Sequence, residues 1–568
     1  MLRFLSPAVV LGRDLVWLFD LDWGGQVYHL SDRTVSAPFG SGGADLEYVA
    51  GLEFGGSLED AIDLFDVDAS QRVASLTLHL SGIVNVPARI EDGHDLAAAS
   101  GRLWLWPVGS SDRLLLVDGE IVDPSYEGEH DPVALSVRES AEDDRALLPG
   151  DDRRVVFGDP GAAGVTWDDN PTGAPLGLDG KRADLALQWY PLIVGHPGNG
   201  TAWAAPVLTA QHDRWVVAGH LSQAATVEII NTDTGEESTF DVSGGTDQLG
   251  NPITTIDPTN PTIGSGWPSA DWGTTRAESF AARWSAPTVA GGVITAGGDG
   301  MPDPWDPFRL HSGLRGAGDV LRWLLQQSTI RHDAGRLAVV AEGLNTYKID
   351  TAISATPDTR ISPWAYAADQ LIPLLPVSVR TGPGGLYLVR WRFDVSGADS
   401  VASLVRGHNA ERTSAIEYQG RDHVANSIRV DYGHDLIEDN PTASVLVTGD
   451  EIEQGRAPYG VSTYPARLSR SRYGVRPFEV SAPVVHDRAT AIQIGTWIAA
   501  ARCAPSRVVS YSIPAELAAL EPGDVVTLTD DEIALSDRLA HVDAIAWQAS
   551  GQSGGTLRIF EGLPTLRS

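Results

Sequence analysis

Cysteine is almost absent from this chain: Cys503 is the single one among 568 residues. One thiol excludes an intrachain disulfide and a cysteine-bound metal cluster. Long apolar runs are also missing, because no stretch reaches the roughly 18 apolar residues that span a bilayer. The apolar segment 4–11 contains Pro7 and is followed by no small-residue cleavage site, so we expect a first β-strand there instead of a signal peptide, and folding in the cytoplasm.

Positive charge is scarce. Lys and Arg total 41 against 75 Asp and Glu, which gives a net charge of −34, and the only lysines are Lys181 and Lys348. Such a chain is not expected to bind nucleic acid by neutralising phosphates. Its surface would repel DNA, which suits a wall that DNA slides past, although acidic charge also serves simply to keep a protein soluble.

Familiar catalytic motifs are lacking too. There is no His-Glu-x-x-His metal motif and no phosphate-binding loop ending in Gly-Lys-Ser/Thr. The string Gly551-Gln552-Ser553-Gly554-Gly555 matches a hydrolase nucleophile elbow, but that elbow needs a helix after it. Strand-like sequence lies on both sides here, so a hairpin loop is expected. Asp66-x-Asp68-x-Ser70 begins like a calcium loop, but Gln71 replaces the required Gly and Thr77 the final Glu.

Acidic pairs, histidines and tryptophans are the remaining candidates for a site. Two carboxylates roughly 5–9.5 Å apart can hydrolyse a glycosidic bond. The 14 His are scattered, which favours surface or core roles over metal binding, and the 17 Trp suit a carbohydrate platform or, more simply, β cores and interfaces. We expect no catalytic, cofactor-binding or metal-binding residue, and we expect solvated turns at the four acidic pairs Asp143-Asp144, Asp151-Asp152, Asp168-Asp169 and Asp530-Asp531.

Turn-forming residues are abundant, with 60 Gly and 35 Pro spread between short apolar runs, and this pattern indicates mainly β structure. Asp118-Gly119 predicts a tight hairpin, and the polar stretch 142–154 is typical of a linker. The polar run 244–275 has little periodicity and predicts extended loops. Strands are expected at Val73–Leu80, Leu103–Trp106, Leu114–Val117 and Pro132–Val137, and shorter ones at Ala205–Leu208, Trp215–Val217 and Thr226–Ile230.

Helices are predicted from residue 311 onward. Asp319 is expected to cap a helix that carries Val320, Leu321, Leu324 and Leu325 on one face. Ser362-Pro363 has the N-cap and first-turn proline of a second helix that ends near Pro373, and Asp487 is expected to cap a third. Strands return at Val508–Ser512, Asp524–Thr529, His541–Trp547 and Thr556–Phe560.

These patterns predict a multidomain α+β protein that is mainly β with some α. Its expected divisions are an N-terminal β domain (1–150), an irregular Gly-, Pro- and Trp-rich β insertion (151–310), a helix-containing middle domain (311–470) and a C-terminal β domain with one helix (471–568).

Three segments together resemble the central hub proteins at the tail tip, or baseplate, of tailed bacteriophages and gene transfer agents. The opening β domain of such hubs resembles Gly51–Leu80 followed by Gly101–Trp106 and Leu116–Gly119. Their middle part, where a helix leads into a small domain and a hairpin, resembles Asp319–Leu325, Ile349-Asp350, Leu374–Pro376 and Gly384–Val389.

The third segment carries the most specific resemblance. It comprises Asn426–Tyr432, Tyr473-Gly474, the helix from Asp487, Val508–Ser512 and Leu520–Thr529. Its last strand is entered through Pro522-Gly523-Asp524, in which Pro-Gly makes the turn and Asp is expected to fix it. Residues 155–310 have no such counterpart.

The resemblance implies a homotrimer whose tube-like β-barrel or β-sandwich domains, two from each subunit, imitate a six-membered ring. Such a hub adapts the six-fold tail tube to a three-fold tip and lets DNA pass during ejection. Closed association of this kind also covers strand edges. The implied partners are the tail tube or distal tail protein, the tape-measure protein and tail fibre or tip proteins, with no specific nucleic-acid binding and no membrane anchor. The implied location is the virion.

Other functions remain open at this stage. A distal tail ring protein, hexameric and carrying receptor-binding proteins, is the structural alternative, and the length and the helix-bearing second half favour the hub. A tail-associated glycan or peptidoglycan hydrolase is the enzymatic alternative, and a secreted carbohydrate-binding protein is a third class. Our expectation is that the protein is not an enzyme, because no constellation of residues has the spacing that hydrolysis needs.

Overall fold

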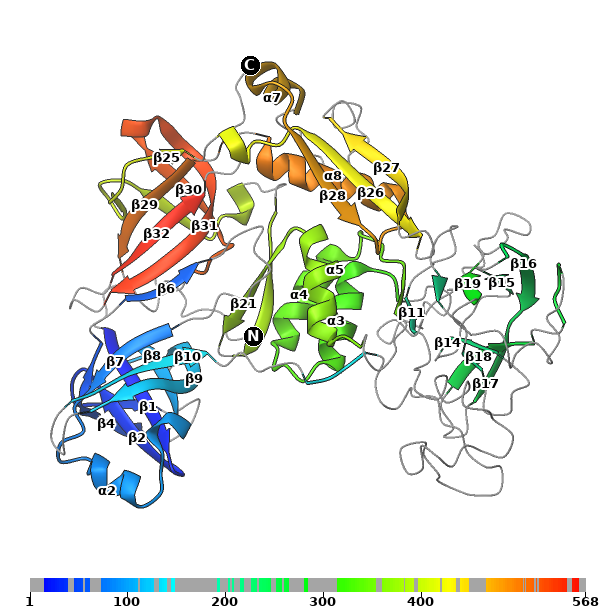
Figure 1. The fold of residues 1–568 in the computed structure, drawn as a ribbon. Helices are drawn as coiled ribbons and strands as arrows, with labels where there is room; N and C mark the ends of the chain where they lie inside the picture. Colours follow the sequence, from blue (N-terminus) through cyan, green and yellow to red (C-terminus); the bar gives the residue numbers. More distant parts are fainter. Residues whose placement is uncertain are drawn as a thin grey trace, which may run out of the picture.

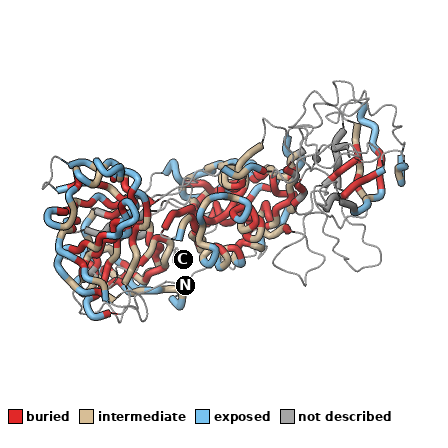
Figure 2. Tube along the Cα trace, turned by 90° about the horizontal axis from the view of Figure 1, so that it is seen from below, coloured by how far each residue is buried: buried red, intermediate tan, exposed pale blue. Residues whose placement is uncertain are grey.

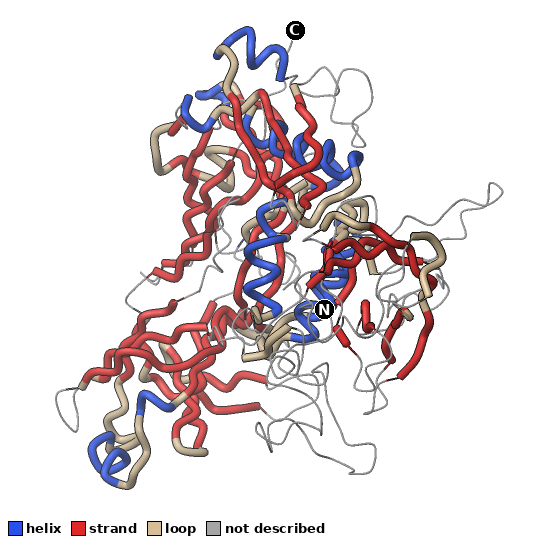
Figure 3. Tube along the Cα trace, turned by 45° about the vertical axis from the view of Figure 1, so that its right-hand side comes forward, coloured by secondary structure: helices blue, strands red, loops and turns tan. Residues whose placement is uncertain are grey.

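The computed structural model describes, with short gaps, residues 15–148, 314–448 and 466–560, together with separate strands between residues 192 and 284 (Figure 1). The expected strand at 4–11, the calcium-like segment 66–70 and the acidic pairs at 143, 151 and 168 lie outside the described residues. Strands dominate and helices are few, so the predicted mainly β, α+β and multidomain fold class is confirmed (Figure 3).

The N-terminal unit is one curled sheet whose strands alternate buried and exposed residues, as in β10, where Val133, Leu135 and Val137 point inward. The strands expected in this region are present. Helix α2 (Val86–Glu91) and the 3-10 helix η1 (Leu96–Ala98) follow β7. The sheet order is β3 (Val35–Pro38), β4 (Asp45–Ala50), β2 (Gln26–Ser31), β1 (Leu15–Trp23), β8 (Ser100–Pro107), β9 (Leu114–Ser125), β10 (Val133–Glu139), β7 (Val73–Leu78) and β5 (Leu52–Glu53).

The two ends of this sheet meet at Gly51, between β4 and β5. Its N–H donates to the carbonyl of Ser31 at 2.9 Å, and its carbonyl accepts from the N–H of His79 at 2.8 Å. A Cβ at this position would come within 2.8 Å of the His79 carbonyl oxygen, so glycine permits the close approach. The sheet therefore curls toward a tube, although its strand ladder does not close into a barrel.

The hairpin predicted at Asp118-Gly119 is wrong, because β9 runs straight through both residues. The glycine serves a different purpose. A Cβ on Gly119 would lie 2.0 Å from the carbonyl oxygen of Arg138 on β10, so the residue allows two backbones to pack closely.

The insertion contains two small sheets. One has the order β12 (Trp203–Ala204), β19 (Phe280–Trp284), β15 (Thr226–Asn231) and β16 (Glu237–Asp241); the other has β13 (Val207–Leu208), β14 (Trp215–Ala218), β18 (Pro252–Ile256) and β17 (Ser243–Thr246). Strands β17 and β18 correct the expectation of loops throughout 244–275, because cross-strand pairing forms them without an apolar alternation. The insertion is joined to the middle unit where β11 (Leu192–Val194) pairs with β20 (Thr351–Ile353).

The middle unit begins with three helices: α3 (Ala317–Gln327), α4 (Ala334–Leu344) and α5 (Pro363–Gln370), the last followed by the 3-10 helix η6 (Ile372–Leu374). Ser362 caps α5 as predicted, since its side chain accepts from the N–H of Ala365 at 3.1 Å. Asp319 does not cap α3, which starts after Gly316. The side chain of Asn345 replaces a cap there, accepting from the N–H of Asp319 at 3.0 Å and donating to its carboxylate at 2.7 Å.

The hairpin of β21 (Val377–Gly382) and β22 (Gly385–Arg390) follows, and then a three-stranded sheet. Helix α8 (Arg488–Arg502) packs on that sheet. Asp487 caps α8 as predicted, accepting from the N–H of Thr490 at 2.9 Å. The 3-10 helix η8 (Arg421–His423) and helix α7 (Ala466–Tyr473) flank the sheet, whose order is β27 (Asn440–Val447), β26 (Ser427–Asp435) and β28 (Pro477–Ala482).

The C-terminal sheet contains the predicted late strands. Asp524 fixes the turn before β30 as predicted: its carboxylate accepts from the N–H of Glu521 at 2.9 Å, and Gly523 supplies a φ of +90°. The order is β23 (Ala402–Val405), β30 (Val525–Asp530), β31 (Leu535–Gln548), β32 (Gly554–Phe560), β29 (Arg507–Pro514) and β24 (Glu411–Arg412), with β25 (Glu417–Tyr418) also on β29, and short 3-10 helices η7 (Gly397–Asp399) and η10 (Asp531–Ile533) nearby.

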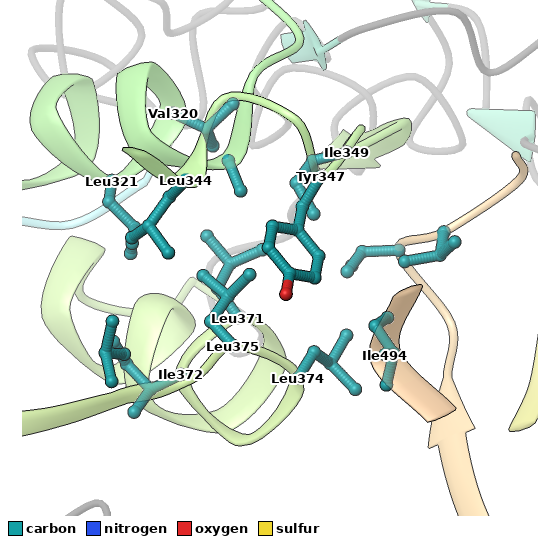
Figure 4. Close-up of a cluster of buried hydrophobic side chains, with 14 of the residues drawn as sticks. Val320, Leu321, Leu344, Tyr347, Ile349, Leu371, Ile372, Leu374, Leu375 and Ile494 are labelled. Carbon is teal, nitrogen blue, oxygen red and sulfur yellow. The ribbon is translucent and has the colours of Figure 1, made fainter. Parts of the chain in front are cut away.

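Two large cores organise these elements (Figure 2). In the second core, α8 packs with the middle helices, and Ile494 lies beside Leu374 (Figure 4). The sequence-based division placed α8 in the C-terminal β domain and residues 402–405 in the middle domain. In the structure, α8 packs in the core of the middle unit. Residues 402–405 form β23, which pairs in parallel with β30 of the C-terminal sheet.

Candidate functional site: the junction of the two β-rich ends

The N-terminal part of the chain contributes a strand to the C-terminal sheet. Strand β6 (Ser57–Ala61) pairs antiparallel with β31, with Leu58 opposite Trp547 and Ala61 opposite Ala544. The edge is available because β30 begins only at Val525, opposite His541, so the second half of β31 is left uncovered on that side. A free edge presents unpaired backbone N–H and C=O groups, and β6 pairs with them.

Both sheets also share a single hydrophobic core. Leu58 has no exposed surface and belongs to the same cluster of buried side chains as Leu78 of β7 and Ile545 of β31. Figure 1 shows β6, drawn in blue, lying against the orange and red strands of the C-terminal sheet. Two β units that are separated in the sequence by residues 140–401 are therefore fixed side by side by apolar burial and backbone pairing.

The hairpin β21–β22 packs at this junction, and every residue of β21 is buried. On the side of the N-terminal sheet, the hydroxyl of Thr381 donates to the carboxylate of Glu139 at 3.1 Å, and both side chains are buried. Arg380 is fully buried on the same strand. Burial lowers the pKa of its guanidinium, and the neighbouring Tyr387 and Glu521 oppose that shift.

On the side of the C-terminal sheet, helix α4 is attached by Arg336. Its guanidinium donates to both carboxylate oxygens of Glu521, at 3.2 and 3.0 Å, and lies over the ring of Tyr387 at 4.5 Å. Burial by itself lowers the pKa of Arg336, but the neighbouring Glu521, Tyr387 and Asp333 together outweigh it, and the pKa is raised. Such two-pronged pairs are directional, so this contact fixes the orientation of α4 on the Pro522-Gly523 turn.

A further contact is made where β22 leaves the hairpin. The ring of His541 on β31 meets Trp391 edge-on, with the centroids 5.4 Å apart, and its Nε2 lies 2.9 Å from the carbonyl oxygen of Arg392. Burial lowers the pKa of His541. The lowered pKa favours the neutral imidazole, which serves here as a hydrogen-bonding group between elements.

Asp530 corrects the expectation of a solvated turn at the pair Asp530-Asp531, whereas Asp531 is exposed. Asp530 ends β30 with no exposed surface, and its carboxylate accepts from the hydroxyl of Tyr511 at 2.9 Å. Arg406 and Arg412 lie 3.6 and 3.5 Å from it. The cluster neutralises a buried charge at a strand end, as a structural ion pair does.

The other candidates from the sequence can now be placed in the fold. Residues 551–553 of the elbow-like string lie outside the described residues, whereas Gly554 and Gly555 begin β32, so a strand follows Ser553 where a nucleophile elbow needs a helix. The tryptophans whose side chains are described are buried or half-buried, including Trp23, Trp391 and Trp497. In the described part of the chain, no group of His, Cys, Asp and Glu is arranged to hold a metal ion. Among the described helices, none combines the length and apolar character needed to cross a membrane.

The sequence did not reveal the junction residues. Strand β6 has the sequence Ser-Leu-Glu-Asp-Ala, in which one apolar residue gives no alternation to detect. Arg336 and Glu521 are 185 residues apart, and a single sequence gives no sign that they meet. The only available signal was the Pro522-Gly523-Asp524 turn, whose first neighbour is Glu521.

One family model matches part of the chain. Residues 464–545, from α7 to most of β31, match a family described as "Putative phage tail protein". The matched region includes the Pro522-Gly523-Asp524 turn, and the match supports a phage tail protein without distinguishing a hub from other tail components. No curated protein matches the chain.

Solved structures of phage tail and virion proteins are similar at low levels, as three of them illustrate. The 43 kDa tail protein of prophage MuSo2 from Shewanella oneidensis has a TM-score of 0.36 and 9% identity, over 95% of this chain and 98% of that chain. The virion of a native gene transfer agent particle gives 0.33 and 12%, over 67% and 85%. Prophage tail protein gp18 from Listeria monocytogenes EGD-e gives 0.25 and 11%, over 65% and 94%. At these TM-scores the similarities define neither the fold nor the role of this chain.

Proposed function

We propose that this phage tail protein is the hub subunit of the tail tip and that it acts as a homotrimer. In this role it adapts the six-fold tail tube to a three-fold tip and lets DNA pass on ejection. Its partners would be the tail tube or distal tail protein, the tape-measure protein, and fibre or tip proteins. The protein would be made in the host cytoplasm and work in the virion.

The observation that supports this proposal most directly is that the two β-rich ends of the chain are held side by side. A trimer can imitate a six-membered ring only if each subunit contributes two β units at a constant spacing. Here β6 pairing with β31, the shared core around Leu58 and the Arg336–Glu521 pair hold the two units together. Rigid attachment of this kind is what a ring of alternating β units requires.

A reconstruction of the intact particle tests the role directly. We expect three copies around the tail axis, with the N-terminal and C-terminal sheets alternating around the ring. Six equivalent copies would assign the chain to the distal tail ring instead.

We further propose that the protein is not an enzyme. The ionic clusters described above join elements together: Asp530 is enclosed by Tyr511, Arg406 and Arg412, and Glu521 is engaged by Arg336. Purified protein incubated with peptidoglycan or capsule polysaccharide should release no fragments. Release that disappears when a single Asp or Glu is changed would support the hydrolase alternative.

A further inference from the structure

Arginines gather around helix α7. The segment 466–476 holds four arginines and no acidic residue, in a chain whose net charge is −34. Arg472 is exposed, and Arg470 and Arg476 are half-buried. Val475 beside them is 66% exposed, which is high for a large apolar side chain.

A buried amide orients this segment. The side chain of Asn426, which has no exposed surface, donates to the hydroxyl of Ser469 and to the carbonyl of Gly474, both at 2.9 Å, and accepts from the N–H of Arg476 at 2.8 Å. Ser469 is thereby fixed inward. The exposed Arg421 lies in η8, which leads into Asn426, next to the exposed Asp422. We call Arg421, Arg470, Arg472, Val475 and Arg476 the basic pole.

Acidic residues gather at the opposite end of the molecule. Asp22, Glu91, Asp92 and Asp95 are all exposed around the turn after α2. The neighbouring Arg89 offsets only one of these charges, and its Nη2 donates inward to the carbonyls of Trp23 and Gly24 at 3.1 and 3.2 Å, so the surface stays negative. Figure 1 places α2 at the bottom of the molecule and α7 at the top. We call these four carboxylates the acidic pole.

We propose that the basic pole docks onto the acidic pole of a second copy of this chain. Two copies that each carry −34 repel one another, and a contact that sets positive charge against negative reduces this repulsion and selects one orientation. Because the poles lie at opposite ends, the contact is head-to-tail, and contacts of this type close into a ring when the rotation between copies permits. The proposal rests on the homo-oligomeric hub and names the surfaces that would join its subunits.

Charge reversal in the full-length chain tests it. The variant R421E/R472E reverses the basic pole, E91K/D92K reverses the acidic pole, and a third variant combines all four changes. R488E is the matched control, because Arg488 is an exposed arginine at the start of α8. The other end of this helix, Arg502, lies beside the basic pole, since its carbonyl accepts from the N–H of Ala425, and Arg488 is about 21 Å away from it at 1.5 Å per residue. Self-association is measured by sedimentation and native mass spectrometry over a range of concentrations, with circular dichroism to verify folding.

We expect each two-residue reversal to weaken self-association at least about tenfold, the combined variant to recover most of it, and R488E to match the original chain. Unchanged association of R421E/R472E, or a wild-type chain that stays monomeric at every concentration, overturns the proposal. So does binding of duplex DNA that R421E/R472E abolishes while leaving association intact, because the basic pole would then be a nucleic-acid surface. A pole-dependent hexamer would support the docking surface while contradicting the trimeric hub.

Discussion

The guanidinium of Arg336 and the carboxylate of Glu521 form two hydrogen bonds, at 3.2 and 3.0 Å, between helix α4 and the turn that opens strand β30. The pair joins the helical unit to the C-terminal sheet, and Thr381 on the adjacent hairpin joins the same unit to Glu139 of the N-terminal sheet. The middle unit thus contacts both β-rich ends. These contacts therefore attach it to both sheets.

Loss of one member of this pair should weaken the junction. Glu521→Ala leaves a half-buried guanidinium without its carboxylate, so we expect the free energy of unfolding to fall by about 1–3 kcal/mol. Denaturant titration measures the change. The control is Arg331→Ala, since Arg331 lies 3.9 Å from Asp118 and is 62% exposed, and such a pair contributes about 1 kcal/mol at most. Equal effects of both substitutions would mean that Glu521 has no special role in joining the units.

Removing the apolar anchor of β6 should have a larger effect. Leu58→Ala removes buried methyl groups from the core that both sheets share, and such substitutions cost about 2–5 kcal/mol. Because the core is common, we expect the N-terminal and C-terminal units to lose stability together in protease-protection or hydrogen-exchange measurements. Val339→Ala, at a position that is 76% exposed, is the control and should be nearly neutral. Protection lost in one unit alone would show that β6 does not couple the two sheets.

Acid should destabilise the junction through His541. Burial lowers the pKa of this imidazole in the folded chain, whereas the unfolded chain protonates it near its ordinary pKa of about 6.5. As the pH falls below that value the unfolded state binds more protons, so stability decreases. His541→Gln should reduce this dependence between pH 7.5 and 5.5 by up to about 1.4 kcal/mol per pH unit. An unaltered slope in His541→Gln would show that burial does not lower the pKa of this imidazole.

Local signals in the sequence predicted local structure well. Ser362 and Asp487 cap helices because their side-chain oxygens accept from a backbone N–H in the first turn of the helix. Asp524 fixes its turn in a similar way, by accepting from the backbone N–H of Glu521. Asp319 was misread because Asn345, from the end of another helix, supplies the missing group. Gly119 was misread because the contact that requires a glycine there comes from β10, and a single strand does not show its neighbour.

The candidate site was beyond prediction for a related reason. Strand β6 forms because β31 offers an open edge, and that edge is open because β30 begins only after the Pro522-Gly523 turn, opposite His541. Asp530 was expected in a solvated turn, yet Arg406 and Arg412 from other elements bury it. Ion pairs and strand pairs between distant segments depend on the assembled fold, so the spacing of residues in the sequence does not predict them.

The channel of the assembled tip should be acidic. DNA and the tape-measure protein pass through a hub during ejection, and a basic wall would hold phosphates by counterion release and slow their passage. An acidic wall repels them over a Debye length of about 8 Å at physiological salt. With a net charge of −34 the chain has enough acid to line a channel as well as to coat its outside. We therefore expect the channel-facing strands of the N-terminal and C-terminal sheets to carry more Asp and Glu than Lys and Arg. The particle reconstruction that counts copies also identifies these residues. A neutral or arginine-rich wall would contradict the electrostatic argument, while a copy number of three would still support the hub.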